Sequence, residues 1–150
     1  MAVLFAFLHF VAAFGLFAAI AVEFVLIRGE LTVANARRLM SADQVSGICA
    51  GAVLTVGLAR VFWFEKGADY YFHNAFFIAK LSLFAIVGGL SVYPTLKFLS
   101  WRTAVTQGRM PAVDSSTLRL MQRIIHAELA GTILIILCGV LMARGIGGLA

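Results

Sequence analysis

Four long stretches of the chain are almost entirely apolar, and short polar segments separate them. The apolar stretches cover residues 2–27, 45–64, 72–98 and 118–143. Because a membrane-spanning helix needs about 20 mostly apolar residues, each stretch is long enough to cross a bilayer. The pattern therefore predicts an all-α integral membrane protein, a bundle of four transmembrane helices that forms one domain over residues 1–150.

Polar linkers are expected between the spans, at residues 28–44, 65–71 and 99–117. The last linker contains the turn-forming sequence QGRMP, and Asp114 or Ser115 is placed to cap the fourth helix. Small residues let helix backbones approach each other closely in a membrane. We therefore expect close helix contacts at the glycines of the second and third spans, which are Gly47, Gly51, Gly57, Gly88 and Gly89.

The composition excludes an ordinary soluble domain. Hydrophobic residues make up 62% of the chain and charged residues 13%, whereas soluble domains are typically about 25% charged. The net charge is +5, but the lysines and arginines gather between the apolar runs. This distribution disfavours a nucleic-acid-binding surface, which would need a basic stripe with exposed aromatic residues. No nucleotide-binding, hydrolase or zinc motif occurs.

The basic residues are distributed unevenly among the linkers, and this predicts the orientation. The second linker contains only Lys66, whereas the first and third linkers with their flanks contain most of the others: Arg28, Arg37, Arg38, Lys97, Arg102, Arg109, Arg119 and Arg123. Loops rich in lysine and arginine stay in the cytoplasm. We therefore expect the first and third linkers in the cytoplasm and both termini on the outer side.

Polar side chains interrupt the apolar spans at two depths, and the first group lies in the outer half. With a rise of 1.5 Å per residue, His9 lies about 10 Å, Lys80 about 12 Å and Arg60 about 6 Å below the outer surface. His73 precedes Lys80 by seven residues and shares its helical face. A lysine at this depth costs about 2.5–3.5 kcal/mol on insertion scales, so Lys80 needs a partner or a function. A carbonyl hydrogen bond for His9 and an interfacial position for Arg60 remain open alternatives.

The second polar group is expected in the inner half and contains Glu23, Arg123, His126 and Glu128. His126 lies some 15 Å in depth from His9, so the two histidines are a poor pair of axial ligands for one haem iron. His9 and Lys80 are level instead. Glu128 is rotated about 200° from His126, so the two side chains point to different neighbours. Anchoring of Arg123 to anionic lipid, and a neutral or arginine-paired Glu23, remain open.

Three short segments carry a resemblance to a known family. They are FLHF with His9, IAKLSL with Lys80, and RIIHAELAGTILIILCGVLMARG with Arg123 and Glu128. In these segments the chain resembles the HemJ-type protoporphyrinogen IX oxidases, and over nearly its whole length it resembles a bacterial family of four-span inner-membrane proteins of unknown function. It departs from the HemJ type at residues 127–130, where that family has an Asn-Glu-x-Pro-like sequence. It also has phenylalanines where that family has a tryptophan before the lysine.

The resemblance implies a haem b-binding redox protein of the bacterial inner membrane. His9 would be an axial ligand, and Lys80 a second ligand or a catalytic or electrostatic partner. Arg60 is the candidate to bind a haem propionate, because a guanidinium can donate two hydrogen bonds to a carboxylate. The substrate would be a porphyrinogen, and electrons would pass to quinone or a respiratory partner.

Two alternatives to this function remain open. The first is a non-enzymatic transport or metal-handling subunit in which His9, Glu23, Lys80 and His126 line a polar path. The second is a structural accessory subunit of a larger membrane complex. A homo-oligomer is compatible with either.

Overall fold

A computed structural model of the protein describes residues 1–65 and 67–148. These residues form helical segments in the order α1 (Ala2–Leu26), α2 (Val33–Ala59), the π-helix η1 (Arg60–Phe64), α3 (Ala68–Phe72), α4 (Ala75–Thr106) and α5 (Ser115–Ala143). Four helices are long and apolar enough to cross a membrane, with η1 continuing α2. The described part of the chain contains no β-strand. The expected all-α fold with four spanning helices is therefore confirmed, whereas Lys66 lies outside the described residues.

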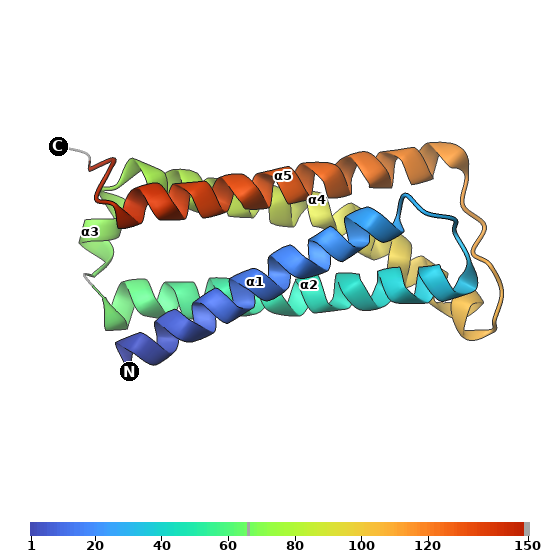
Figure 1. The fold of residues 1–150 in the computed structure, drawn as a ribbon, viewed down its shortest axis with the longest axis horizontal. Helices are drawn as coiled ribbons and strands as arrows, with labels where there is room; N and C mark the ends of the chain where they lie inside the picture. Colours follow the sequence, from blue (N-terminus) through green and yellow to red (C-terminus); the bar gives the residue numbers. More distant parts are fainter. Residues whose placement is uncertain (66, 149–150) are drawn as a thin grey trace.

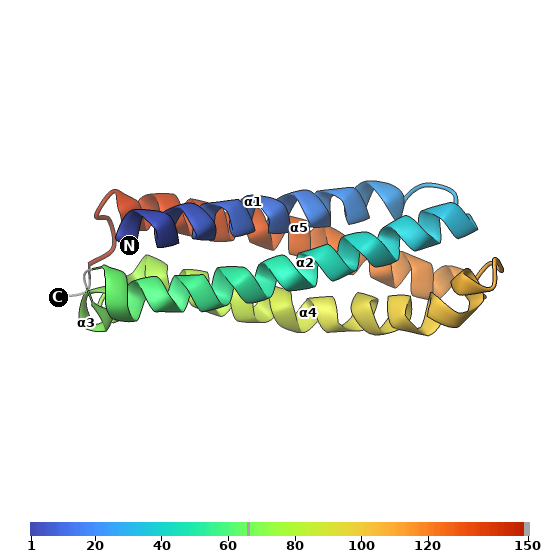
Figure 2. The same cartoon turned by 90° about the horizontal axis from the view of Figure 1, so that it is seen from below.

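The helices form two antiparallel hairpins that lie against each other (Figures 1 and 2). Packing is closest within the hairpins, between α1 and α2 and between α4 and α5. Contacts of α2 with α4 and of α1 with α5 join the two hairpins. The end of the bundle with both termini and α3 is called the terminal end below, and the opposite end, with the α1–α2 and α4–α5 loops, is called the loop end.

Helices α2 and α4 extend further at the loop end than the sequence pattern predicted. The expected linker 28–44 is helical from Val33, and the expected linker 99–117 is helical as far as Thr106. These extensions are amphipathic: Leu39 and Val105 are buried, whereas the neighbouring arginines are exposed. A prediction from continuous apolar runs ends where polar residues begin. An amphipathic turn contains polar residues, so the helix continues beyond the predicted end.

A core that involves all four long helices stabilises the loop end. It is built from Ile27 after α1, Ala36 and Leu39 of α2, Phe98, Trp101 and Val105 of α4, and Met121 and Ile125 of α5. Trp101 is only 4% exposed and packs against the Phe98 ring, with 5.1 Å between ring centroids. It is therefore a core residue, and not the interfacial aromatic residue that its position near the end of a span would suggest.

Side-chain caps define where the helices begin. Thr32 accepts a hydrogen bond from the Asn35 amide at the start of α2, and Asp114 caps α5 as expected. At the terminal end, the Asn74 side chain accepts from the first amides of α4 and donates to the Ile146 carbonyl at 3.1 Å. Asn74 therefore fixes the segment after α5 to the start of α4.

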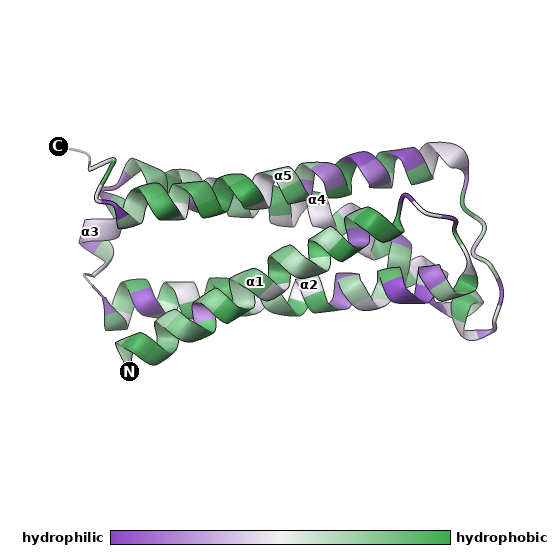
Figure 3. Cartoon of the chain, in the orientation of Figure 1, coloured by the Kyte–Doolittle hydropathy of each residue, from purple (hydrophilic) through white to green (hydrophobic). Residues whose placement is uncertain are grey.

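Most residues along the middle of the bundle are hydrophobic, and hydrophilic residues are frequent at the loop end and near α3 (Figure 3). Large apolar side chains are exposed along the middle of the helices, including Phe7, Phe14, Ile48, Ile86 and Leu137. Exposed apolar surface of this extent is what contact with lipid requires, because lipid tails do not penalise it.

Close helix contacts occur at glycines that differ in part from the expected ones. A Cβ atom at Gly57 would lie 2.9 Å from His9 Cε1, which agrees with the expected contact. Open space lies beside the other four expected glycines. The close contacts are instead at Gly15, which faces Cys49 across α1 and α2, and at Gly131, which faces Val87 across α4 and α5. Sequence identifies small residues but not the helix face that meets a neighbour.

We predict that Gly131→Ala destabilises the α4–α5 hairpin, whereas Gly139→Ala does not. A Cβ atom at Gly131 would lie 2.5 Å from Cγ2 of Val87, a side chain with little freedom to move. At Gly139 a Cβ atom would meet nothing within 4 Å. Overpacking typically costs about 1–3 kcal/mol. Thermal unfolding in detergent should show a lower midpoint for Gly131→Ala only, and equal midpoints for the two variants would contradict the close contact of Gly131 with Val87.

Candidate functional site

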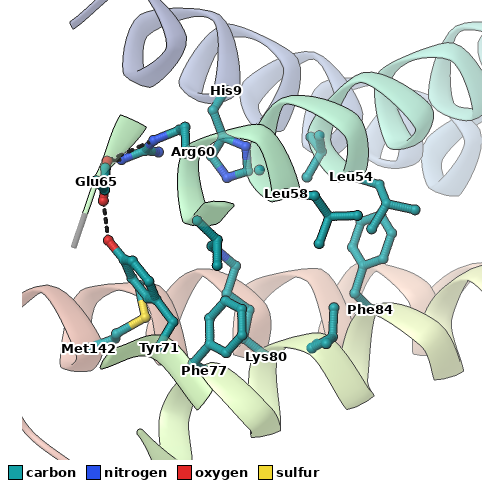
Figure 4. A pocket seen from close by; sticks show the side chains of 14 residues that line it. His9, Leu54, Leu58, Arg60, Glu65, Tyr71, Phe77, Lys80, Phe84 and Met142 are labelled. Atoms are coloured by element: carbon teal, nitrogen blue, oxygen red, sulfur yellow. Dashed lines mark hydrogen bonds and ion pairs between the residues drawn. The ribbon is translucent and has the colours of Figure 1, made fainter. Parts of the chain in front are cut away.

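A cavity between the two hairpins, near the terminal end, is the candidate functional site (Figure 4). Its polar lining consists of His9 of α1, Arg60 of η1, Glu65, Tyr71 of α3 and Lys80 of α4. Valine, leucine and phenylalanine side chains form most of the remaining wall. The cavity volume is about 80 Å³, and one side of the cavity is open.

His9 points into this cavity from α1, and one of its ring nitrogens has no partner. The residue is 8% exposed, and Nδ1 is buried without a hydrogen bond to any described residue. The imidazole lies against Gly57, whose lack of a side chain makes room for the ring, and beside the Val53 backbone. A buried polar atom without a partner typically costs about 1–3 kcal/mol, so His9 is the first candidate at this cavity for contact with a ligand.

Lys80 faces the same cavity from the opposite hairpin (Figure 4). It lies five residues after Ala75, the first residue of α4, which places it about 8 Å from the start of that helix. Within the described part of the chain its ammonium group makes no hydrogen bond and no ion pair. The charges of Lys80 and Arg60 are close enough to act on His9. His9 and Lys80 therefore line the same cavity from different hairpins.

Arg60 is already paired at the edge of the cavity. Its guanidinium forms an ion pair with Glu65, with Nε donating to Oε1 at 2.9 Å, and the Tyr71 hydroxyl donates to Oε2 of Glu65. In an α-helix, residues five positions apart point about 140° away from each other. The π-helix η1 has a wider turn with i→i+5 hydrogen bonds and brings such residues to the same side. The local π geometry therefore makes the Arg60–Glu65 pair possible.

The ion pair and the Tyr71 hydrogen bond set the protonation of Glu65 and Tyr71. Burial by itself would raise the pKa of Glu65, but the hydrogen bonds from Tyr71 and Arg60 and the charge of Arg60 outweigh burial and lower the pKa below its usual range. The pKa of Tyr71 is raised by burial and by its hydrogen bond to the Glu65 carboxylate. Glu65 is therefore ionised and Tyr71 neutral at physiological pH.

Sequence reasoning missed two residues of this site and included one that lies elsewhere. Glu65 and Tyr71 were not proposed, and the available signal was the five-residue spacing of Arg60 and Glu65, which indicates a pair only if a π-helix is assumed. His73 does not line the cavity. Its side chain is exposed at the protein surface, where Nδ1 lies 2.8 Å from the Asp69 carbonyl oxygen.

The second polar group expected from the sequence is divided by the structure. Glu23 and Glu128 are buried inside the bundle, at 2% and 3% exposure. Arg123 and His126 are exposed on the outer face of α5, and the His126 ring packs against Phe24 with 5.6 Å between centroids. The predicted difference in direction between Glu128 and His126 agrees with this arrangement. Among the described residues, no group of three or more His, Cys, Asp or Glu side chains is placed to hold a metal ion.

Comparison with known proteins identifies the family. Residues 1–147 match the family model described as "Predicted membrane protein (DUF2214)". The chain therefore belongs to this family of predicted membrane proteins, and the expected resemblance to a membrane protein family of unknown function is confirmed. No curated protein and no solved structure matches the chain. The resemblance to HemJ-type oxidases stays a prediction.

We predict that Tyr71→Phe raises the pKa of Glu65, because it removes one of the hydrogen bonds that stabilise the carboxylate. Since the folded-state pKa of Glu65 is lowered, its contribution to stability is present at neutral pH and is lost as the pH falls through that pKa. The loss of thermal stability on acidification should therefore be smaller in Tyr71→Phe and should be complete at a higher pH. Carbon NMR of the Glu65 carboxyl group gives the pKa directly.

Tyr93→Phe is the matched control for this titration, because the Tyr93 ring lies near Lys97 in the loop-end half of α4 and does not line the cavity. Its Glu65 titration should be that of the unmodified protein. An unchanged Glu65 pKa in Tyr71→Phe would contradict the hydrogen bond between Tyr71 and Glu65.

Proposed function

We propose that this protein is a haem b-binding redox protein of the bacterial inner membrane, with His9 as a ligand of the haem iron. The observation that supports this proposal is the unpartnered Nδ1 of His9, buried at a cavity that Lys80 lines from the other hairpin. Neutral imidazole is a common ligand of haem iron. The HemJ-like segments around His9 and Lys80 point to the same pair of residues.

The residues at the cavity fit haem in their donor chemistry. Imidazole and amine nitrogens face the cavity, and apolar side chains form its walls. The cavity volume of about 80 Å³ is well below the range of about 300–1,000 Å³ for small-molecule pockets. It is too small for a whole porphyrin. Haem binding therefore requires the hairpins to separate at the terminal end, while the loop-end core keeps them joined.

The charged residues of the site would have separate tasks. Arg60 is held by Glu65, so Lys80 is the cation of the cavity that is available to an anionic group such as a carboxylate. The ion pair with Glu65 and the Tyr71 hydrogen bond fix the edge of the cavity next to η1. This pairing makes Lys80 a better candidate than Arg60 for contact with a propionate or with the carboxylates of a porphyrinogen.

A bound haem would supply one-electron redox chemistry. The residues of this chain would position the haem and set the polarity around it. His9 would hold the iron, the apolar walls would exclude water, and Lys80 would favour negative charge at the cavity. By resemblance to the HemJ type, the reductant would be a porphyrinogen, and quinone or a respiratory partner would accept the electrons. By the positive-inside rule, the arginine-rich loop end would lie in the cytoplasm and the cavity in the outer half of the membrane.

We predict that the purified protein shows a haem Soret band and that His9→Ala abolishes it. Oxidised and dithionite-reduced visible spectra in mild detergent measure this after expression with added haem. His126→Ala is the matched control, because His126 is exposed on the far side of α5 from the buried Glu128. Its spectrum should equal that of the unmodified protein. A colourless protein after haem is supplied would refute haem binding.

Growth of a strain that lacks protoporphyrinogen oxidase tests the more specific activity. We expect the unmodified gene to restore growth and Lys80→Gln to fail, because the substitution removes the cation that faces the cavity. Lys97→Gln, at the loop-end half of the same helix, should restore growth normally. A haem-bound protein that does not restore growth would leave haem binding in place and exclude this oxidase activity.

A further inference from the structure

Three carboxyl groups from three helices lie near one another in the loop-end half of the bundle, away from the His9 cavity. They are Glu23 of α1, Asp43 of α2 and Glu128 of α5. Asp43 and Glu128 are close enough to act electrostatically on Glu23, and Asp43 acts on Glu128. The fourth long helix contributes Thr95, whose hydroxyl donates to Asp43 Oδ1 at 2.6 Å. Each long helix therefore contributes an oxygen-bearing side chain to this carboxyl cluster.

Two members of the carboxyl cluster have buried oxygens without partners. Glu23 and Glu128 are 2% and 3% exposed, and Oε1 of each has no hydrogen bond to a described residue. Among the described residues, none of the three carboxyl groups forms an ion pair with a lysine or an arginine. An ionised carboxylate without a cation is very costly in such an environment, whereas a protonated carboxyl group is neutral and can donate a hydrogen bond.

A groove connects the carboxyl cluster with the charged surface of the loop end. Asp43 and Thr95 lie in this groove between α2 and α4, and the exposed Arg37 and Arg102 lie at its rim. Asp43 follows Arg37 by six residues, which is about 9 Å along α2. The groove has a volume of about 520 Å³, and several of its lining side chains are polar. Water at the loop end therefore reaches Asp43, whereas Glu23 and Glu128 are buried and do not line the groove.

We propose that the carboxyl cluster is a proton-binding site, in which Glu23 and Glu128 hold protons at neutral pH and Asp43 exchanges them with water in the groove. The ligand is a proton because it neutralises each buried carboxyl group individually and needs no ring of ligands around it. No described group of side chains in the cluster is arranged to hold a metal ion. Thr95 donates a hydrogen bond to the Asp43 carboxyl group, and the Ser46 hydroxyl donates to the Asp43 carbonyl oxygen.

This site is independent of the proposed haem site. Leu16 and Ile20 come between His9 and Glu23 along α1, and they form a hydrophobic cluster with Val53, against which Phe84 and Leu129 pack. Protons therefore enter and leave the carboxyl cluster on the loop-end side of this barrier. The experiment below needs no haem, so a failure of haem binding and a failure of proton binding give separate results.

Infrared spectroscopy of the protein in lipid films tests the proposal. Exposed Asp and Glu have pKa values near about 4 and are ionised at pH 7. We expect the carbonyl band of protonated carboxyl groups to persist at pH 7 in the unmodified protein. Glu23→Gln and Glu128→Gln should each lower this band, and the double variant should remove it. Glu30→Gln, which changes an exposed carboxylate at the loop end, is the matched control and should leave the band unchanged.

The role of Asp43 is tested by transfer of the film to D2O. Asp43→Asn should keep the band but slow its deuterium shift severalfold, because the exchanging group in the groove is lost. An equal rate in Asp43→Asn would overturn the exchange route. Labelling the unmodified protein with a hydrophobic carbodiimide, which reacts with protonated carboxyl groups, should mark Glu23 and Glu128 in peptide mass spectra and requires no variant to fold.

Two results would overturn proton binding. The first is the absence of the protonated band at pH 7 in the folded, unmodified protein. The second is loss of the band when Na⁺ replaces a bulky organic cation at constant pH, because this would identify the cluster as a cation site. Unchanged spectra in the two cations, together with carbodiimide labels on Glu23 and Glu128, are the expected results.

Discussion

The cost of placing polar groups in a medium without water governs this structure. In the hydrocarbon region a charge or an unpaired polar atom has no solvent to compensate it, so such groups gather inside the bundle or at its ends. Most of the basic side chains lie at the loop end, on the exposed face of helices that extend past the apolar segments. The polar groups that remain within the spans are collected at two places, the His9 cavity and the carboxyl cluster. Both functional proposals depend on these two groups of buried polar residues.

The packing of the two hairpins differs around the His9 cavity and around the carboxyl cluster. At the loop end, side chains from all four long helices form one core, and the carboxyl cluster is enclosed with only Asp43 facing a groove. At the terminal end the buried cluster is smaller, with Val61, Tyr71 and Phe77, and a cavity separates the hairpins. Packing within each hairpin is closer than packing between them. The terminal end is therefore the part of the bundle that can admit a ligand with the least loss of packing.

Local backbone geometry decides which charges are available in the cavity. The π-helix η1 turns Glu65 towards Arg60, and the Tyr71 hydroxyl completes the chain of hydrogen bonds. Without this wide turn, Arg60 would be a second unpaired cation beside Lys80. The pair leaves Lys80 as the cation that faces the apolar part of the cavity. A small irregularity in one helix thus separates a structural arginine from a lysine that is free to act on a ligand.

The sequence by itself determined the number of spans and the all-α class. These follow from run length and from a constant rise per residue, which do not depend on how the helices pack. Only the tertiary structure decided the rest. Helical rise gives depth but not the direction of a side chain around the bundle, so the sequence grouped the buried Glu23 with the exposed Arg123. It also missed Asp43, because that residue lies in an amphipathic extension interpreted as a linker. Which glycines meet a neighbour and which carboxyl groups share a buried space depend on the rotation of each helix, which is fixed only when four helices pack together.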